Sequence, residues 1–171
     1  MKGYIHVYTG DGKGKTTAAL GLAVRAAGAG LKVFFAQFLK SGNYSEHEAL
    51  KRFSDVIEVR QYGRGCFIRG EPQKEDIESA TKGILEVKDV ISSGKYDVVI
   101  LDEANIAIYY GLIKLDQLIE ILRNRPPHVE VVITGRNADP KLIEEADLVT
   151  EMREIKHYYK KGVLARTGIE R

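Results

Sequence analysis

The sequence predicts an α/β fold, in which a mostly parallel β-sheet carries helices on both faces. Three observations predict this class. Apolar stretches of strand length alternate with longer stretches of helical pattern along the chain. A glycine-rich segment joins the first apolar stretch to an alanine-rich one. The chain has 171 residues, 44 % hydrophobic and 29 % charged, which suits a single domain over residues 1–171.

Strands are expected where β-branched, aromatic and aliphatic residues follow one another over a short length. These stretches lie at residues 4–8, 32–39, 56–60, 97–103, 129–134 and 148–152. The stretch at 97–103 is the clearest after the first, and it ends in two carboxylates. The stretch at 56–60 is a weaker strand.

Helices are expected between these strands. The first follows the glycine-rich segment, is rich in alanine and ends near the glycines of residues 28–30. Ser45 and Glu48 have the spacing of a capping box, which predicts a short helix over residues 46–53 that begins at Ser45.

Three further helices follow along the chain. Residues 73–92 form a helix whose apolar face is predicted to carry Ile77, Ala80, Thr81, Ile84 and Ile91. A helix around residues 115–122 ends before the prolines at 126–127. Asp139 is the N-cap of a last helix, because Pro140 follows it in the first turn.

The segments that follow the strands should meet at one edge of the sheet. Right-handed crossovers gather the carboxyl ends of parallel strands there, and open α/β sheets bind their ligands at that edge. These segments are the glycine-rich segment, the loop from Lys40, residues 62–72, Asp102–Glu103 and Gly135–Arg136.

The glycine-rich segment has the composition of a phosphate-binding loop. It reads Thr9, Gly10, Asp11, Gly12, Lys13, Gly14, Lys15, Thr16, Thr17. The glycines let backbone N–H groups approach phosphate oxygens, and the positive end of the next helix points at the same place. Lys15 supplies a positive charge to the phosphates, and the Thr16 hydroxyl can bind Mg²⁺.

This loop departs from the usual pattern G-x-x-x-x-G-K-[ST] at one position. Counting back from Gly14 places Thr9 where the first glycine belongs, and the glycines alternate instead. A glycine-rich hairpin turn without a ligand is the alternative interpretation. Gly-Lys-Thr-Thr at a strand-to-helix junction favours phosphate binding, because a turn does not require it.

Asp102 and Glu103 follow four apolar strand residues, as at a Walker B strand end. One carboxylate would hold Mg²⁺, directly or through water, together with substrate phosphates. A solvated strand end is the alternative. In a hydrolase Glu103 would orient a water molecule. In a transferase whose nucleophile carries no proton, Glu103 would be a metal ligand.

Two arginines and a lysine are candidates for contacts with phosphate. Arg136 follows Gly135 at a strand tip, where a guanidinium can bind phosphate through two hydrogen bonds. Arg25 lies near the end of the first helix, and a solvated surface cation is the alternative for both arginines. Lys13 lies within the loop and is expected to reach the phosphates.

For most of the remaining reactive side chains we expect no catalytic role. The four histidines are scattered and lack metal-ligand spacing, and we expect structural or surface roles for His6, His47 and His128. His157 lies in a basic segment and its role is open. Cys66 is expected to be inert, since no histidine partner can be assigned to it.

Composition argues against several classes of function. A net charge of +2 does not indicate nucleic-acid binding, and one cysteine excludes an intrachain disulfide. No apolar run has the length of a membrane span, and the first residues resemble a strand rather than a signal peptide. We therefore expect a cytoplasmic protein. Residues 153–171 contain six Lys and Arg residues and are expected to form an ordered basic arm.

These motifs make the chain resemble the P-loop ATP:corrinoid adenosyltransferases over nearly its whole length. The most specific parts are the Thr9–Thr17 loop with its alternating glycines and the Thr134-Gly135-Arg136 tip. Other matching segments are residues 26–28, 30–33, 37–40, 101–103, 125–126, 132–133, 146–147, 156–157 and 168–170.

The resemblance implies a RecA-like P-loop fold and a reaction. The 5′-deoxyadenosyl group of ATP would pass to the Co(I) of a reduced corrinoid, giving adenosylcobalamin or its precursor and triphosphate. Members are usually homodimers, and a flavin-type reductase would suit as electron donor. The implied nucleotide or corrinoid contacts are Thr9, Gly10, Asp11, Gly12, Lys13, Gly14, Lys15, Thr16, Thr17, Arg25, Arg136 and Phe67. The implied Mg²⁺ ligands are Thr16, Asp102 and Glu103, and the implied catalytic residues are Lys15, Thr16 and Glu103.

Two features depart from the family pattern. Better-known members carry a Phe and a Trp in the segment that matches residues 62–72, whereas this chain has no Trp. Phe67 is the candidate that would keep the lower axial ligand off the cobalt. Asp11 replaces the Asn common in the loop and adds a negative charge near the phosphates.

Two other functions are alternatives. A P-loop hydrolase or kinase would release ADP or inorganic phosphate rather than triphosphate, and it would need a base such as Glu103. A nucleotide-dependent binding module would use the basic arm on nucleic acid, and its binding would depend strongly on salt.

Overall fold

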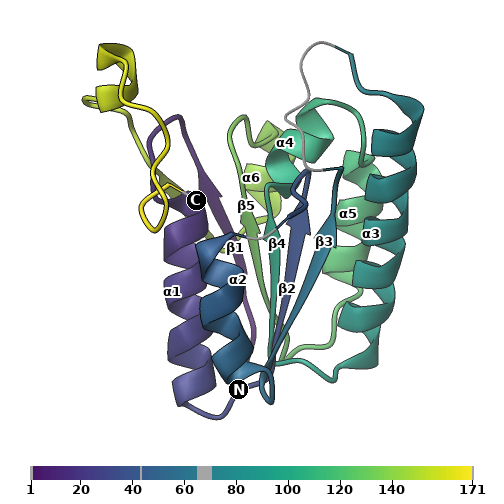
Figure 1. Ribbon diagram of the computed structural model, residues 1–171. Coiled ribbons are helices and arrows are strands. Elements are labelled where there is room, and N and C mark those ends of the chain that lie inside the picture. The colour runs from purple at the N-terminus through teal and green to yellow at the C-terminus, as the bar shows by residue number, and fades with distance from the viewer. Residues whose placement is uncertain (1, 43, 65–70, 171) are drawn as a thin grey trace.

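A computed structural model describes residues 2–42, 44–64 and 71–170 of the chain. Within these residues six strands form one sheet in the order β3-β2-β4-β5-β1-β6, and each neighbouring pair is parallel (Figure 1). The strands are β1 Ile5–Thr9, β2 Val33–Phe38, β3 Ile57–Tyr62, β4 Val98–Asp102, β5 Glu130–Thr134 and β6 Leu148–Glu151. The predicted α/β class with a parallel sheet is confirmed.

Helices cover both faces of this sheet (Figure 1). They are α1 Lys15–Gly28, α2 Ser45–Leu50, α3 Lys74–Ser93, α4 Ala104–Tyr109, α5 Leu115–Arg123 and α6 Pro140–Glu145, with 3₁₀ turns η1 Lys51–Phe53 and η2 Tyr158–Lys161. Helices α1 and α2 lie on one face, and α3 to α6 pack on the other. None of the helices in the described ranges has the length and hydropathy that a membrane span requires.

The alternation of side chains along each strand divides the core into two layers. On β2, Phe34 and Phe38 join the cluster under α3, whereas Val33 and Phe35 join the cluster under α1. All six residues of β2 are buried, because the strand is covered on both faces. The small Ala19, Ala23 and Ala26 side chains are the buried residues of α1 in this core, so α1 lies close to the sheet.

Some local predictions were wrong. Tyr44 rather than Ser45 is the N-cap of α2, and its backbone N–H donates to Nδ1 of His47 at 3.4 Å. Helix α4, directly after β4, was not predicted, because six residues are too short for a clear helical period. Ile77, predicted on the buried face of α3, is 46 % exposed. It lies in the first turn of α3, which extends beyond the strand ends (Figure 1).

One helical glycine is required by packing. Gly83 lies in the middle of α3, and a Cβ there would be 2.6 Å from Cγ of Tyr62 and 2.8 Å from Cε1 of Phe38. Gly21 lies in the middle of α1, where a Cβ would meet nothing within 4 Å. The two glycines therefore form a matched pair.

We expect Gly83→Ala to lower the free energy of unfolding by about 1–3 kcal/mol, because the added methyl group overpacks the contact with two aromatic rings. Gly21→Ala should instead raise it by roughly 0.5–1 kcal/mol, since alanine is the better helix former. Urea unfolding of both variants measures the two changes. Equal responses at the two sites would contradict the packing argument.

Candidate active site at the carboxyl edge of the sheet

The glycine-rich loop connects β1 to α1, as the sequence predicts. Gly10 and Gly14 have φ angles of 96° and 115°, which side-chain-bearing residues rarely adopt. Gly14 is the N-cap of α1, and the first turn of α1 contains no acidic residue. The positive end of α1 is therefore not neutralised by its own side chains and can receive an anion.

A second constraint on the loop comes from the residue that follows β6. The N–H of Gly12 donates to the carbonyl of Met152, just after β6, at 2.7 Å. A Cβ on Gly12 would lie 2.7 Å from that same oxygen, and one on Gly10 would also collide with it. The glycines at 10 and 12 are thus required by the close approach of Met152, which explains why they alternate.

Lys15 occupies the centre of the loop. Its Nζ donates to the carbonyls of Gly10 at 2.6 Å and Gly12 at 2.7 Å, and the residue is 8 % exposed. Burial lowers the pKa of this ammonium, which the nearby charge of Glu103 partly offsets. The lysine is thereby held in place at the start of α1 before any phosphate binds.

Asp102 at the end of β4 is the hub of the site and is fully buried. Its Oδ1 accepts hydrogen bonds from the hydroxyls of Thr16 at 2.8 Å and Thr134 at 2.7 Å. Its Oδ2 accepts from Nζ of Lys40 at 3.0 Å and Nε2 of Gln37 at 3.2 Å. Four donors thus satisfy the four lone-pair sites of this carboxylate.

Lys40 is the counterion of Asp102. Burial alone would lower the pKa of the Lys40 ammonium, but the carboxylates of Asp102 and Glu103 outweigh that effect and raise it. Lys40 is therefore held as the ammonium, and its 3.0 Å contact with Asp102 pairs the two side chains, as buried ionisable groups require.

Glu103 turns away from the strand that precedes it. Its φ of 60° is left-handed, and its N–H donates to Oγ1 of Thr134 at 3.0 Å. Burial raises the pKa of its carboxyl, the charge of Asp102 raises it further, and Lys40 and Lys15 oppose both. Glu103 is half-buried, whereas Asp102 is fully buried.

These side chains suit a Mg²⁺ ion that also binds phosphate. Thr16 donates its proton to Asp102, so the lone pairs of its oxygen are free for a cation. The Glu103 carboxylate is a second oxygen donor. No cluster of three or more His, Cys, Asp or Glu side chains occurs in the described ranges, so phosphate oxygens would complete the coordination.

The other residues predicted to contact the nucleotide or the corrinoid lie in or near the loop, with one exception. Arg136 lies beside the loop, and its Nη2 donates to the carbonyl of Asp11 at 3.4 Å. Oγ1 of Thr9 accepts from the N–H of Ala138 at 3.3 Å. Thr17 belongs to the first turn of α1. Phe67, the candidate for the axial-ligand role, lies outside the described residues.

Two predicted cations are not directed at the loop centre. Arg25 is in the last turn of α1, ten residues and about 15 Å along the helix from Lys15. Lys13 turns outward, and its Nζ forms an ion pair with Oε1 of Glu170 at 3.1 Å.

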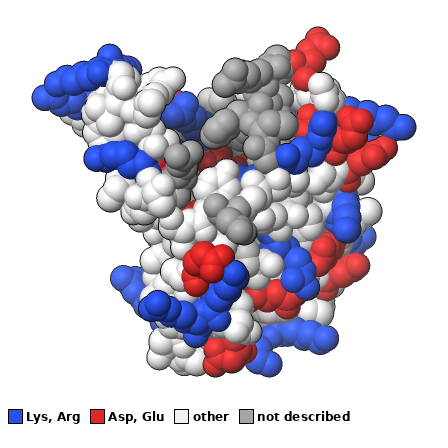
Figure 2. All heavy atoms as spheres, viewed as in Figure 1, with Lys and Arg blue, Asp and Glu red and all other residues white. Residues whose placement is uncertain are grey.

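The C-terminal arm, residues 153–170, holds Glu170 against the loop. Its carboxylate accepts from the Tyr158 hydroxyl and from Nε of Arg166 at 3.2 Å, in addition to Lys13. These contacts lower the pKa of Glu170, and Arg166 is the main cause. The arm lies beyond the first turn of α1 (Figure 1), and Lys and Arg side chains gather on it (Figure 2).

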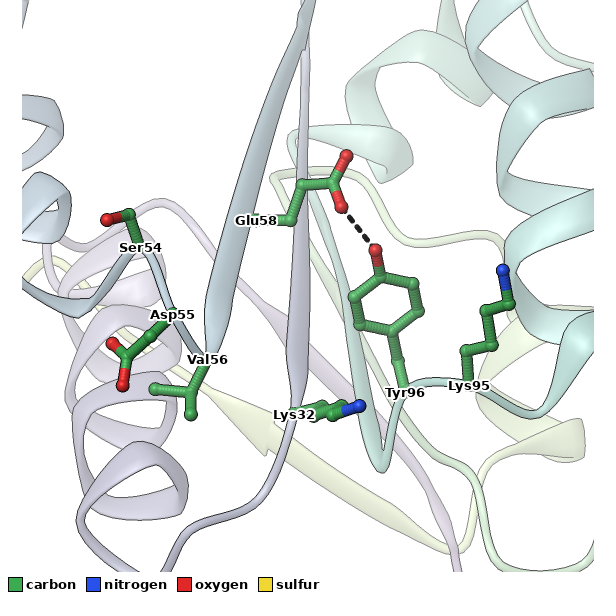
Figure 3. A pocket seen from close by; sticks show the side chains of 7 residues that line it. All are labelled: Lys32, Ser54, Asp55, Val56, Glu58, Lys95 and Tyr96. Carbon is green, nitrogen blue, oxygen red and sulfur yellow. Dashed lines mark hydrogen bonds between the residues drawn. The ribbon is translucent and has the colours of Figure 1, made fainter.

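A cavity of about 400 Å³ lies at the opposite edge of the sheet. Figure 3 shows the Tyr96 hydroxyl directed at the Glu58 carboxylate, with Lys32 and Lys95 nearby. These residues precede or begin strands β2, β3 and β4, so the cavity is at their amino ends. It is therefore separate from the phosphate-binding loop.

Sequence reasoning missed Gln37 and Thr134 as site residues. Each is a polar residue at or near the end of a buried strand, and each is fully buried. The alternation of side chains along a strand could have found them. Gln37 shares a face of the sheet with buried Phe35, and Thr134 shares that face with buried Val132, so each is a polar side chain at a buried position.

The comparisons with known proteins agree with this geometry. A family model described as ATP:corrinoid adenosyltransferase BtuR/CobO/CobP matches residues 1–171. The chain belongs to this family. A corrinoid adenosyltransferase from Pseudomonas aeruginosa is 36 % identical over 170 residues, which cover 99 % of this chain and 84 % of the relative. One from Sinorhizobium is 38 % identical over 172 residues, covering 99 % and 80 %.

A third relative, corrinoid adenosyltransferase CobA from Salmonella typhimurium, is 34 % identical over 169 residues, covering 99 % of this chain and 86 % of the relative. The resemblance inferred from the loop and the Thr-Gly-Arg tip is thereby confirmed. Adenosyltransferase family members are thus matched over the Asp102 hub, the loop and the arm together.

The raised pKa of Glu103 predicts a pH-dependent stability difference. The folded protein binds the proton of the Glu103 carboxyl more tightly than the unfolded chain does. The stability that this proton contributes is complete below the unfolded pKa of about 4.3, and it is lost as the pH rises through the pKa of Glu103 in the folded protein. Glu103→Gln should therefore be more stable than the wild type at pH 7 and equal to it near pH 4 in urea unfolding.

Exposed Glu144 supplies the control for this measurement. Glu144→Gln should show no such change in its stability difference between pH 4 and pH 7. A Glu103→Gln variant that was less stable than the wild type at pH 7 would contradict the assignment.

Proposed function

We propose that the protein transfers the 5′-deoxyadenosyl group of ATP to the Co(I) of a reduced corrinoid, in corrinoid biosynthesis or salvage. The observation that carries this proposal is family membership over the whole chain, together with a loop built to hold a chain of phosphates. In the reaction the cobalt electron pair forms a bond to C5′. The bond from C5′ to the phosphate oxygen breaks, and its electron pair leaves with triphosphate.

The residues of the loop are proposed to bind the triphosphate leaving group. Lys15, the loop's backbone N–H groups other than that of Gly12, which donates to Met152, and the N-terminus of α1 would stabilise the negative charge that develops on triphosphate. The nucleophile has no proton to lose, so no general base is required. Catalysis then consists of positioning and of charge stabilisation.

Mg²⁺, when bound, would neutralise the charge of the phosphates. Thr16 and Glu103 are the proposed direct ligands, and Arg136 would contact the nucleotide. Asp102 was predicted as a metal ligand, but its four lone-pair sites accept hydrogen bonds within the protein. We therefore assign it the task of orienting the Thr16 hydroxyl, with any contact to the ion passing through water.

Further parts of the proposal come from the family resemblance. They are a homodimeric state, a flavin-type reductase as electron donor and a cytoplasmic location. Phe67 is proposed to keep the lower axial ligand off the cobalt, and Arg25 to contact the nucleotide. The alternative of a P-loop hydrolase or kinase is not favoured by the family match.

Incubation with ATP, Mg²⁺ and chemically reduced cobalamin tests the activity. We expect the absorbance of an alkylcobalamin to develop in step with triphosphate release, measured by ion-exchange chromatography. Release of ADP or inorganic phosphate without alkylcobalamin would identify a hydrolase or kinase instead.

Lys15→Met should lower the rate of this transfer at least about 100-fold, because the loop then loses the charge nearest the leaving group. Lys32→Met at the opposite edge is the matched control and should keep the wild-type rate. A Lys15→Met enzyme with the wild-type rate would refute the role of Lys15.

A further inference from the structure

A row of polar side chains crosses the sheet near the carboxyl ends of its strands, next to the glycine-rich loop. Gln37 on β2 is the register partner of Gln61 on β3 and of Asp102 on β4. Thr134 continues the row on β5 through its bond to Asp102. The row lies on the face that α1 and α2 cover, so Thr16 of α1 and His47 of α2 can reach it.

The chemistry of Asp102 determines how the Gln37 amide is oriented. A carboxylate only accepts hydrogen bonds, so the atom of Gln37 that faces Asp102 at 3.2 Å must be the amide nitrogen. The amide oxygen then faces the opposite way, toward Nε2 of His47 at 2.5 Å. Gln37 is fully buried, so water cannot replace either partner.

The same reasoning determines the proton on His47. The Gln37 oxygen can only accept, so Nε2 of His47 must donate. Nδ1 lies 3.4 Å from the backbone nitrogen of Tyr44 and 3.2 Å from the carbonyl oxygen of Gly42, so it is the contact with Gln37 that places a proton on Nε2. Gln61 also approaches the Gln37 oxygen, but at 3.4 Å, so His47 is the stronger donor.

We propose that His47 is a positioning residue for the magnesium and triphosphate site, acting through Gln37 and Asp102 on the Thr16 hydroxyl. This inference rests on the proposed function. The connected bonds run from His47 to the Gln37 oxygen, from the Gln37 nitrogen to Asp102, and from the Thr16 hydroxyl to Asp102. Of these groups, only Thr16 is a proposed ligand of the ion.

The consequence of losing His47 follows from this chain. Without the Nε2 donor, the Gln37 amide has no strong partner on its oxygen and can rotate. Oδ2 of Asp102 then keeps only Lys40, while Oδ1 still accepts from Thr16 and Thr134, so three donors hold the carboxylate instead of four. The acceptor of the Thr16 hydroxyl is then less firmly oriented, so the direction of the lone pairs offered to the ion is less well defined.

The binding of ATP tests this chain without any corrinoid. We expect His47→Leu to raise the Kd for ATP in the presence of Mg²⁺ by about threefold to tenfold, which is less than the roughly 10–100-fold effect of removing a direct partner of a metal ligand, because His47 acts through two further groups. The Kd in EDTA should change less than about twofold. His47→Gln should bind like the wild type in Mg²⁺, because its amide N–H can donate to Gln37. Calorimetry supplies all these values.

His128→Leu is the matched control, since Nε2 of His128 contacts the Gly94 carbonyl at 3.1 Å, away from the loop. It should leave both Kd values unchanged. Equal weakening of His47→Leu with and without Mg²⁺ would show a merely structural role and overturn the proposal. Failure of His47→Gln to restore binding would overturn it as well.

NMR of ¹⁵N-labelled histidine gives an independent readout. Nε2 of His47 should be protonated, and a ring that carried its proton on Nδ1 alone would overturn the proposal. Failure of the proposed function is distinguishable, because a protein that bound ATP with Mg²⁺ but formed no alkylcobalamin would refute the transfer and leave the role of His47 intact.

Discussion

The structure depends on the burial of one carboxylate. Asp102 is fully buried, and a carboxylate without partners in such a place would cost several kcal/mol. Its four donors come from α1, β5, β2 and Lys40, two residues beyond the end of β2. The requirement to satisfy this one group therefore ties the phosphate-binding loop to the middle of the sheet. A site assembled in this way is already ordered before substrate binds.

The loop itself is constrained from two sides. In front, Lys15 is held by the carbonyls of Gly10 and Gly12, which direct its charge to the start of α1. Behind, the carbonyl of Met152 accepts from Gly12 and leaves no room for a side chain there. The unusual spacing of the glycines thus reflects packing against the end of β6 as much as phosphate chemistry. Thr9 fits where the first glycine is missing, because its hydroxyl accepts from the segment after β5.

The strength of the local sequence signal explains which residues of the site could be predicted. Asp102 and Glu103 are conspicuous because carboxylates follow an apolar run, whereas Gln37 lies inside a motif that reads as an ordinary buried strand. Gln37 matters only because the register of β2 against β4 sets it beside Asp102. His47 offers still less signal, since a six-residue helix brings it to the row and nothing in its local sequence marks that contact.

The sequence by itself determined the α/β class, the strands and most helices, the glycine-rich loop between β1 and α1, and the family. These features are encoded locally, in the period of apolar residues and in the short-range spacing of glycine, lysine and threonine. Only the tertiary structure decided that Lys13 turns toward Glu170, that Arg25 lies far along α1, and that Asp102 has no lone pair to spare. Those outcomes depend on strand order, register and the path of a distant arm, and each joins residues too far apart in the chain for local patterns to connect.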